Sequence, residues 1–168
     1  MDLHIFQRGF NFSQDGPGNR LVYHLQGCNL HCPWCSNPEG MTFCGGTVCS
    51  VEDIVAEVLR SRPMFFDGGG VTLTGGEAAM QPQAVKELLS ALSGYGIHTA
   101  LESNGTAPPA VHPLSLPQPA PSGLQALRPR RPPAGHRRHS VPLVGKSPGG
   151  PGRRCTGGCP HPCYPRLQ

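Results

Sequence analysis

The sequence has no long apolar segment and no apolar N-terminal stretch. It contains no run of about 18 consecutive apolar residues, the length that a membrane-spanning helix requires. Its first residues include acidic and polar side chains where a secretory signal peptide would be apolar. We therefore expect a soluble, cytoplasmic protein with no membrane partner.

Acidic residues and several large apolar residue types are missing from the second part of the chain. Residues 107–168 contain no Asp, Glu, Ile, Phe, Met or Trp, but they hold 15 of the 20 prolines. Such a segment buries too little apolar surface to offset the entropy lost on ordering, so we expect it to be disordered. Because this composition also arises when a GC-rich gene is read out of frame, we hypothesise a truncation or frameshift near residues 107–112.

Positive charge is concentrated in this low-complexity tail. Residues 107–168 carry nine of the 14 Lys and Arg residues, whereas all ten acidic residues lie in residues 1–106. Nine positive charges would attract phosphate groups in a salt-dependent way. Tyr164 is the tail's single aromatic residue, so stacking on bases has almost no platform. We expect no specific nucleic-acid partner.

Residues 1–106 alternate between strand and helix patterns. Short apolar runs predict strands starting near residues 21, 71 and 97, and DGPG at 15–18 predicts a turn between two N-terminal strands. Two amphipathic helices separate the three strands, which predicts an α/β fold of parallel strands with right-handed crossovers. In a barrel or a doubly wound sheet, the carboxyl ends of such strands carry the chemistry. The expected helical faces are Val51, Ile54, Val55, Val58 and Leu59, starting after Ser50, and Val85, Leu88, Leu89 and Leu92, ending at Gly94.

Three cysteines follow the first of these strands directly. Cys28, Cys32 and Cys35 form a C-x3-C-x2-C loop, and thiolates are soft ligands that suit iron-sulfur clusters and zinc. A structural zinc site is usually closed by four protein ligands, so zinc is the alternative here. A loop with three thiolates can hold three irons of a 4Fe-4S cluster and leave the fourth iron open.

Other cysteines are interpreted as incidental thiols. Cys44 and Cys49 follow the loop too closely to form a second cluster module. In the tail, Cys155, Cys159 and Cys163 lie near His161, but no apolar core surrounds them to fix ligand geometry.

The cysteine loop, with Trp34 immediately before its last cysteine, resembles the cluster loop of the radical S-adenosylmethionine (SAM) enzymes. The match extends over four segments that together resemble the glycyl-radical-enzyme activating enzymes, the group that includes pyruvate formate-lyase activating enzyme. These segments are QDGPGNR at 14–20, LQGCNLHCPWCSNPEG at 25–40, GGGVTLTGGEAAMQP at 68–82 and GIHTALESNG at 96–105. The resemblance covers about residues 3–107.

The resemblance implies that residues 1–106 form the N-terminal half of a partial (βα)6 radical SAM barrel. It implies a 4Fe-4S cluster on Cys28, Cys32 and Cys35, with SAM bound to the open iron through its amino and carboxylate groups. Glu77 would accept a hydrogen bond from the SAM ammonium, and Trp34 would lie near the adenine. The residues implied around SAM are Trp34, Gly75, Gly76, Glu77, Glu102, Ser103 and Asn104.

The implied activity is reductive cleavage of SAM to methionine and a 5'-deoxyadenosyl radical, which removes a hydrogen from one glycine of a partner glycyl radical enzyme. An electron donor such as flavodoxin or ferredoxin would reduce the cluster under anaerobic conditions. The later βα units of the family have no counterpart in this sequence. We therefore expect a marginally stable fragment with an unpaired parallel edge after the third strand.

Several alternatives remain at this point. A noncatalytic interaction protein that binds zinc or an iron-sulfur cluster is the alternative function. Glu102 and Asn104 are also suited to capping a following helix, and Trp34 is also suited to core packing.

Overall fold

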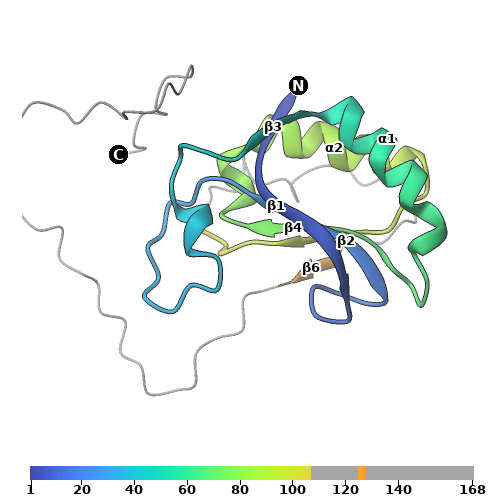
Figure 1. Cartoon of the computed structure of the whole chain (residues 1–168), viewed down its shortest axis with the longest axis horizontal. Coiled ribbons are helices and arrows are strands. Elements are labelled where there is room, and N and C mark those ends of the chain that lie inside the picture. Colours follow the sequence, from blue (N-terminus) through green and yellow to red (C-terminus); the bar gives the residue numbers. More distant parts are fainter. Residues whose placement is uncertain (107–124, 128–168) are drawn as a thin grey trace, which may run out of the picture. The chain divides into compact units, whose positions relative to one another are not determined.

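The computed structural model describes residues 1–106 and, for the backbone alone, residues 125–127. These residues build a six-stranded sheet in the order β3-β1-β2-β4-β5-β6, accompanied by two α-helices (Figure 1). The strands are β1 (Asp2–Phe12), β2 (Asn19–Leu25), β3 (Thr47–Ser50), β4 (Gly70–Gly75), β5 (Thr99–Glu102) and β6 (Gln125–Leu127). The helices are α1 (Val51–Ser61) and α2 (Pro82–Gly94), and the 3-10 turns η1, η2 and η3 span Pro38–Met41, Arg62–Met64 and Ala78–Met80.

The parallel part of the sheet follows the predicted alternation of strands and helices. β2 pairs with β4 and β4 pairs with β5, both in parallel, with α1 and α2 as the connecting helices. Strands that run in the same direction need such crossovers. The prediction of an α/β fold with parallel strands is therefore confirmed, and the carboxyl ends of β2, β4 and β5 lie at one edge of the sheet.

Helix α1 begins where the sequence predicts. The Ser50 hydroxyl caps the first turn by accepting a hydrogen bond from the backbone N–H of Asp53 at 3.0 Å, and it donates one to the Asp53 carboxylate at 2.7 Å. The helix ends at Ser61, and Pro63 lies in the following turn η2. Within residues 1–106, no helix has both the length and the apolar character needed to cross a bilayer.

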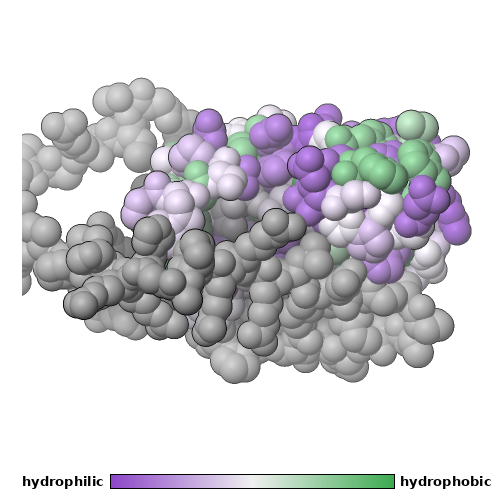
Figure 2. All heavy atoms as spheres, turned by 90° about the horizontal axis from the view of Figure 1, so that it is seen from below, coloured by the Kyte–Doolittle hydropathy of each residue, from purple (hydrophilic) through white to green (hydrophobic). Residues whose placement is uncertain are grey.

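Antiparallel strands extend the sheet on the other side of β2. β1 pairs with β2 around a turn at 13–18 that includes the predicted turn at 15–18, and β3, which has no clear signal in the sequence, pairs with β1. At the turn end of this hairpin, Phe10 stacks at an angle on Phe65 and Phe12 does so on Phe66. Figure 2 shows hydrophobic residues gathered on the surface toward one end of the described part. These ring pairs join the hairpin to the segment between α1 and β4.

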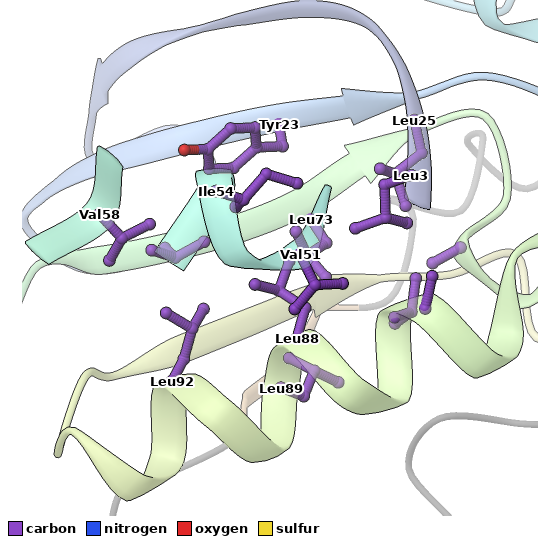
Figure 3. Close-up of a cluster of buried hydrophobic side chains, with 14 of the residues drawn as sticks. Leu3, Tyr23, Leu25, Val51, Ile54, Val58, Leu73, Leu88, Leu89 and Leu92 are labelled. Atoms are coloured by element: carbon purple, nitrogen blue, oxygen red, sulfur yellow. The ribbon is translucent and has the colours of Figure 1, made fainter. Parts of the chain in front are cut away.

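The apolar core lies between the two helices and one face of the sheet. Tyr23, Leu25 and Leu73 point from the strands toward the helices, where Ile54 and Leu88 meet them (Figure 3). Because strand side chains alternate between the faces, the residues between them point the other way. Those on the opposite face are mainly polar and include Arg20, His24, Thr72, Thr74 and Glu102. The predicted face of α2 is buried throughout, whereas Val55 and Leu59 of α1 are only half-buried.

The expectation of an unpaired edge after β5 is wrong. β6 pairs in parallel with β5, with Leu101 opposite Ala126 and Glu102 opposite Leu127. Strand pairing requires backbone N–H groups, which proline lacks. Residues 122–128 contain no proline, although the surrounding segment is rich in it, so this stretch can pair with β5. The predicted disorder or frameshift of the remaining tail, and the cysteines near His161, lie outside the described residues.

A buried guanidinium closes the opposite, N-terminal end of the parallel strands. Arg20 of β2 has no exposed surface and donates to Thr72 Oγ1 at 2.7 Å, the Val71 carbonyl at 2.6 Å and the Pro17 carbonyl at 3.1 Å. Burial lowers the pKa of Arg20 to about 10, and the charge of Asp15 partly offsets this effect. The side chain remains protonated at neutral pH and joins the 13–18 turn to β4.

Replacing Arg20 by Met should lower the free energy of unfolding by about 3 kcal/mol or more. Several buried acceptors would lose their donor, and each such loss costs about 1–3 kcal/mol. Urea denaturation monitored by circular dichroism measures the effect. The control is Arg60→Met at an exposed position of α1, where we expect a change within about 0.5 kcal/mol. Equal losses in the two variants would contradict the bridging role of Arg20.

Candidate functional site

Three loops meet where β2, β4 and β5 end. The cysteine loop follows β2, the segment 75–77 follows β4, and the segment 102–104 ends β5 and continues beyond it. Leu25 and Gly75 are register partners, so the first two loops start side by side. The carboxyl edge of a parallel sheet is where ligands commonly bind in such folds. The structure therefore brings the predicted cluster and SAM residues to one edge.

Close backbone contacts join the cysteine loop to the end of β4. The Gly76 N–H donates to the Leu25 carbonyl and the Glu77 N–H donates to the Gly27 carbonyl, both at 2.8 Å. A side chain at position 76 would not fit, because its Cβ would lie 2.2 Å from the Gly27 carbonyl oxygen. Gly75 has a φ of 98°, which a residue with a side chain rarely adopts. The two glycines thus allow the loops to lie against each other.

The three cysteines are half-buried free thiols, and two of them accept a hydrogen bond from a backbone N–H. Cys28 Sγ accepts a hydrogen bond from the Leu30 N–H, and Cys35 Sγ accepts one from the Asn37 N–H, each at 3.4 Å. Burial raises the pKa of the Cys28 thiol, and the Leu30 N–H partly offsets this effect. N–H donors directed at sulfur favour the thiolate form that binds metals.

Glu77 is fully buried and joins the loops after β4 and β5. Its Oε1 accepts hydrogen bonds from the Ala79 N–H at 2.9 Å and the Ser103 hydroxyl at 3.0 Å, and its Oε2 accepts one from the Asn104 N–H at 2.7 Å. The family resemblance implies a contact between this carboxylate and the SAM ammonium. That contact stays a prediction, and the structure adds a second task, because Glu77 fixes the position of Ser103 and Asn104.

Glu102 and Trp34 occupy different environments. Glu102 is half-buried on the sheet face opposite the helices, where its Oε2 accepts a hydrogen bond from the Thr74 hydroxyl. Burial raises the pKa of Glu102, and the bond from Thr74 partly offsets the rise. Trp34 lies on the cysteine loop with 61% of its surface exposed. The alternative prediction that Trp34 packs in the core is therefore wrong. Its contact with an adenine stays a prediction.

The structure adds site residues that the sequence did not indicate. Asn29 Oδ1 accepts a hydrogen bond from Asn104 Nδ2 at 2.9 Å, and Asn29 Nδ2 donates to the Thr106 hydroxyl at 2.7 Å. Gln26 Nε2 donates to the carbonyls of Glu39 and Thr42 at 2.8 and 2.7 Å. These amides tie both ends of the cysteine loop to their surroundings. A single Asn or Gln in a loop has no periodicity from which such a role could be read.

The donor set fits a 4Fe-4S cluster. In residues 1–106, no three His, Cys, Asp or Glu side chains converge as the ligands of a single metal ion. A cluster binds each cysteine to a different iron, so it does not require three sulfur atoms around one point. Three soft donors on one loop, with N–H groups directed at two of the sulfurs, are the chemistry that such a cluster uses.

Comparisons with known proteins point to the same family. The sequence profile described as the Radical SAM superfamily matches residues 22–115. Pyruvate formate-lyase-activating enzyme of Clostridium pasteurianum is 42% identical over 93 residues, which are 54% of this chain and 39% of that protein. Pyruvate formate-lyase 1-activating enzyme of Escherichia coli K12 is 42% identical over 92 residues, which are 54% of this chain and 37% of that protein. The chain thus spans less than half the length of these curated relatives.

A solved structure shares the fold. The crystal structure of QueE from Escherichia coli superposes with a TM-score of 0.50 at 20% sequence identity, covering 63% of this chain and 54% of that one. At this level of identity the similarity concerns the fold alone.

Replacing Gly76 by Ala should destabilise the protein by about 1–3 kcal/mol, because the new methyl group would collide with the Gly27 carbonyl. Urea denaturation of the chain without cofactors measures the effect. Gly94→Ala is the matched control, since a Cβ at position 94 meets nothing within 4 Å and Ala favours helix by up to about 1 kcal/mol. Equal stability of the two variants would contradict the close approach at Gly76.

Replacing Glu102 by Gln should stabilise the protein without cofactors at pH 7. A carboxyl group whose pKa is raised in the folded state destabilises that state at pH values above the folded pKa, and this cost disappears below the ordinary value of 4.5. The advantage of the variant should therefore shrink as the pH falls from 7 toward 4. Urea denaturation at several pH values tests this, with Glu39→Gln at an exposed position as control. A pH-independent difference would contradict the assignment.

Proposed function

Because this chain belongs to the radical SAM superfamily, we propose that it carries part of a glycyl-radical-enzyme activase. In this proposal, the site binds a 4Fe-4S cluster and SAM, and the activity installs a glycyl radical on a partner enzyme. The main support for this proposal is that the three-cysteine loop lies beside Gly75–Glu77 and Glu102–Asn104 at one edge of the sheet.

Cys28, Cys32 and Cys35 would hold three irons and leave the fourth for the amino and carboxylate groups of SAM. When bound and reduced, the cluster supplies one electron that cleaves SAM to methionine and a 5'-deoxyadenosyl radical. The residues of the chain do the positioning. Gly75 and Gly76 let the cysteine loop pack directly against the end of β4, because a Cβ at either position would collide with backbone atoms of residues 24–27.

The loop after β5 supplies polar groups on the neighbouring side. Glu77 holds Ser103 and Asn104 in place, and Thr74 orients the Glu102 carboxylate on the polar face of the sheet. Because these groups are already held in position, binding a polar cofactor costs little conformational entropy in the protein. Trp34 has an exposed ring that suits contact with an adenine.

The proposed partner is a glycyl radical enzyme, with flavodoxin or ferredoxin as the electron donor. Relatives named pyruvate formate-lyase-activating enzymes support this partner class through 42% identity over 92–93 residues. The match covers only 37–39% of their length, so activation of a partner is proposed here only on this partial similarity. SAM cleavage is therefore the activity to test first.

Anaerobic reconstitution of the whole chain with iron and sulfide should yield about four irons per chain and a brown protein. Addition of SAM and a reductant should release 5'-deoxyadenosine, measured by liquid chromatography. Cys32→Ala should lose the cluster absorbance, whereas Cys44→Ala, outside the proposed ligand set, should retain it. A colourless protein that holds zinc would instead support the noncatalytic alternative.

Retention of the full cluster absorbance by Cys32→Ala would refute the assignment of Cys32 as a ligand. Loss of absorbance in both cysteine variants would show that the triplet is not the complete ligand set of the chain.

A further inference from the structure

The Asn104 side chain bridges the loop after β5 and the cysteine loop. Its Nδ2 lies 2.9 Å from Asn29 Oδ1 and 3.9 Å from Cys28 Sγ, with geometry that suits donation to both. Amide nitrogen carries two hydrogens, so one can go to each acceptor. The contact with Cys28 is the weaker of the two, because it is also longer than the 3.4 Å hydrogen bond from the Leu30 N–H to the same sulfur. Asn104 is thus a second donor to Cys28, after the Leu30 N–H at 3.4 Å.

The surrounding contacts determine which end of the amide faces the sulfur. Asn104 Oδ1 accepts hydrogen bonds from the Thr106 N–H at 2.9 Å and the Thr106 hydroxyl at 2.6 Å, so oxygen must lie on that side. The Thr106 hydroxyl in turn accepts from Asn29 Nδ2, which leaves Asn29 Oδ1 as the acceptor for Asn104. An amide flipped by 180° would place oxygen against oxygen and nitrogen against donors.

The backbone of Asn104 is held as firmly as its side chain. Its N–H donates to the buried carboxylate of Glu77 at 2.7 Å, and Ser103 donates to the same carboxylate. Glu77 is tied to the start of the cysteine loop because its own N–H donates to the Gly27 carbonyl. The contacts form a closed ring from Gly27 through Glu77 and Asn104 back to Cys28. Such a ring keeps the donor near the sulfur at low entropic cost.

We propose that Asn104 is a positioning residue that donates an N–H···S hydrogen bond to the Cys28 thiolate and thereby raises the reduction potential of the cluster. This inference rests on the proposed function, because it requires a cluster on Cys28. A hydrogen bond to a ligating sulfur stabilises negative charge there, and the reduced cluster carries more of it than the oxidised one. The half-buried surroundings of Cys28 strengthen the effect, since water screens it less.

Asn104→Asp removes the amide donor at nearly constant shape and adds negative charge beside Cys28. In the reconstituted full chain, its cluster should therefore have a more negative midpoint potential, measured by anaerobic redox titration with EPR detection. Gln83→Glu makes the same amide-to-carboxylate change at an exposed position of α2 and should leave the potential unchanged. Iron content measured on every sample separates a shifted potential from cluster loss.

An unchanged potential in Asn104→Asp would overturn this inference and leave the proposed function standing. A wild-type chain that assembles no cluster under the same conditions would overturn both.

A second measurement tests the hydrogen bond from Asn104 to Cys28 if the Asn104→Asp variant does not retain its cluster. Wild-type chain is produced with asparagine labelled by ¹⁵N at Nδ2, and pulsed EPR is recorded on the reduced cluster. We expect a ¹⁵N coupling that persists in Asn29→Ser, because the bond to sulfur comes from Asn104. Absence of this coupling in the wild-type protein would overturn the inference.

Discussion

The close approach of two backbones at Gly76 is the constraint on which the rest of this site depends. Because no side chain stands at this position, the cysteine loop can lie directly on the end of β4. The hydrogen bonds from Gly76 to Leu25 and from Glu77 to Gly27 then fix where Cys28 begins. Packing of the helices places the strands, but it is this contact that places the thiols relative to the neighbouring loops.

The two ends of the parallel strands use polar groups in different ways. At the N-terminal end, Arg20 donates to several acceptors at once and is itself fully buried. At the carboxyl end, Gln26, Asn29 and Asn104 bind loop to loop and keep the cysteine sulfurs half-buried. Stability and proposed chemistry are thus separated along the same strands, as the architecture of α/β proteins favours.

Sequence patterns predicted the parts of the fold that have a strong local signal. The cap at Ser50 and the apolar spacing in α1 and α2 were sufficient to locate both helices, and glycine-bounded runs located β2, β4 and β5. Strands β3 and β6 were missed because four and three residues are too short to show alternation. The link between Asn29 and Asn104 joins residues 75 apart in the chain, so no local pattern could indicate it.

The partners of Glu77 have a further electrostatic consequence. Its carboxylate is buried and, within residues 1–106, forms hydrogen bonds only with neutral donors and no ion pair. Neutral dipoles solvate a charge without cancelling it, so its field extends to the surface of this edge. A positively charged molecule arriving there would be attracted before it touched any residue, and an anion would be repelled. Glu77 thus contributes an electrostatic preference for cations to this edge of the sheet.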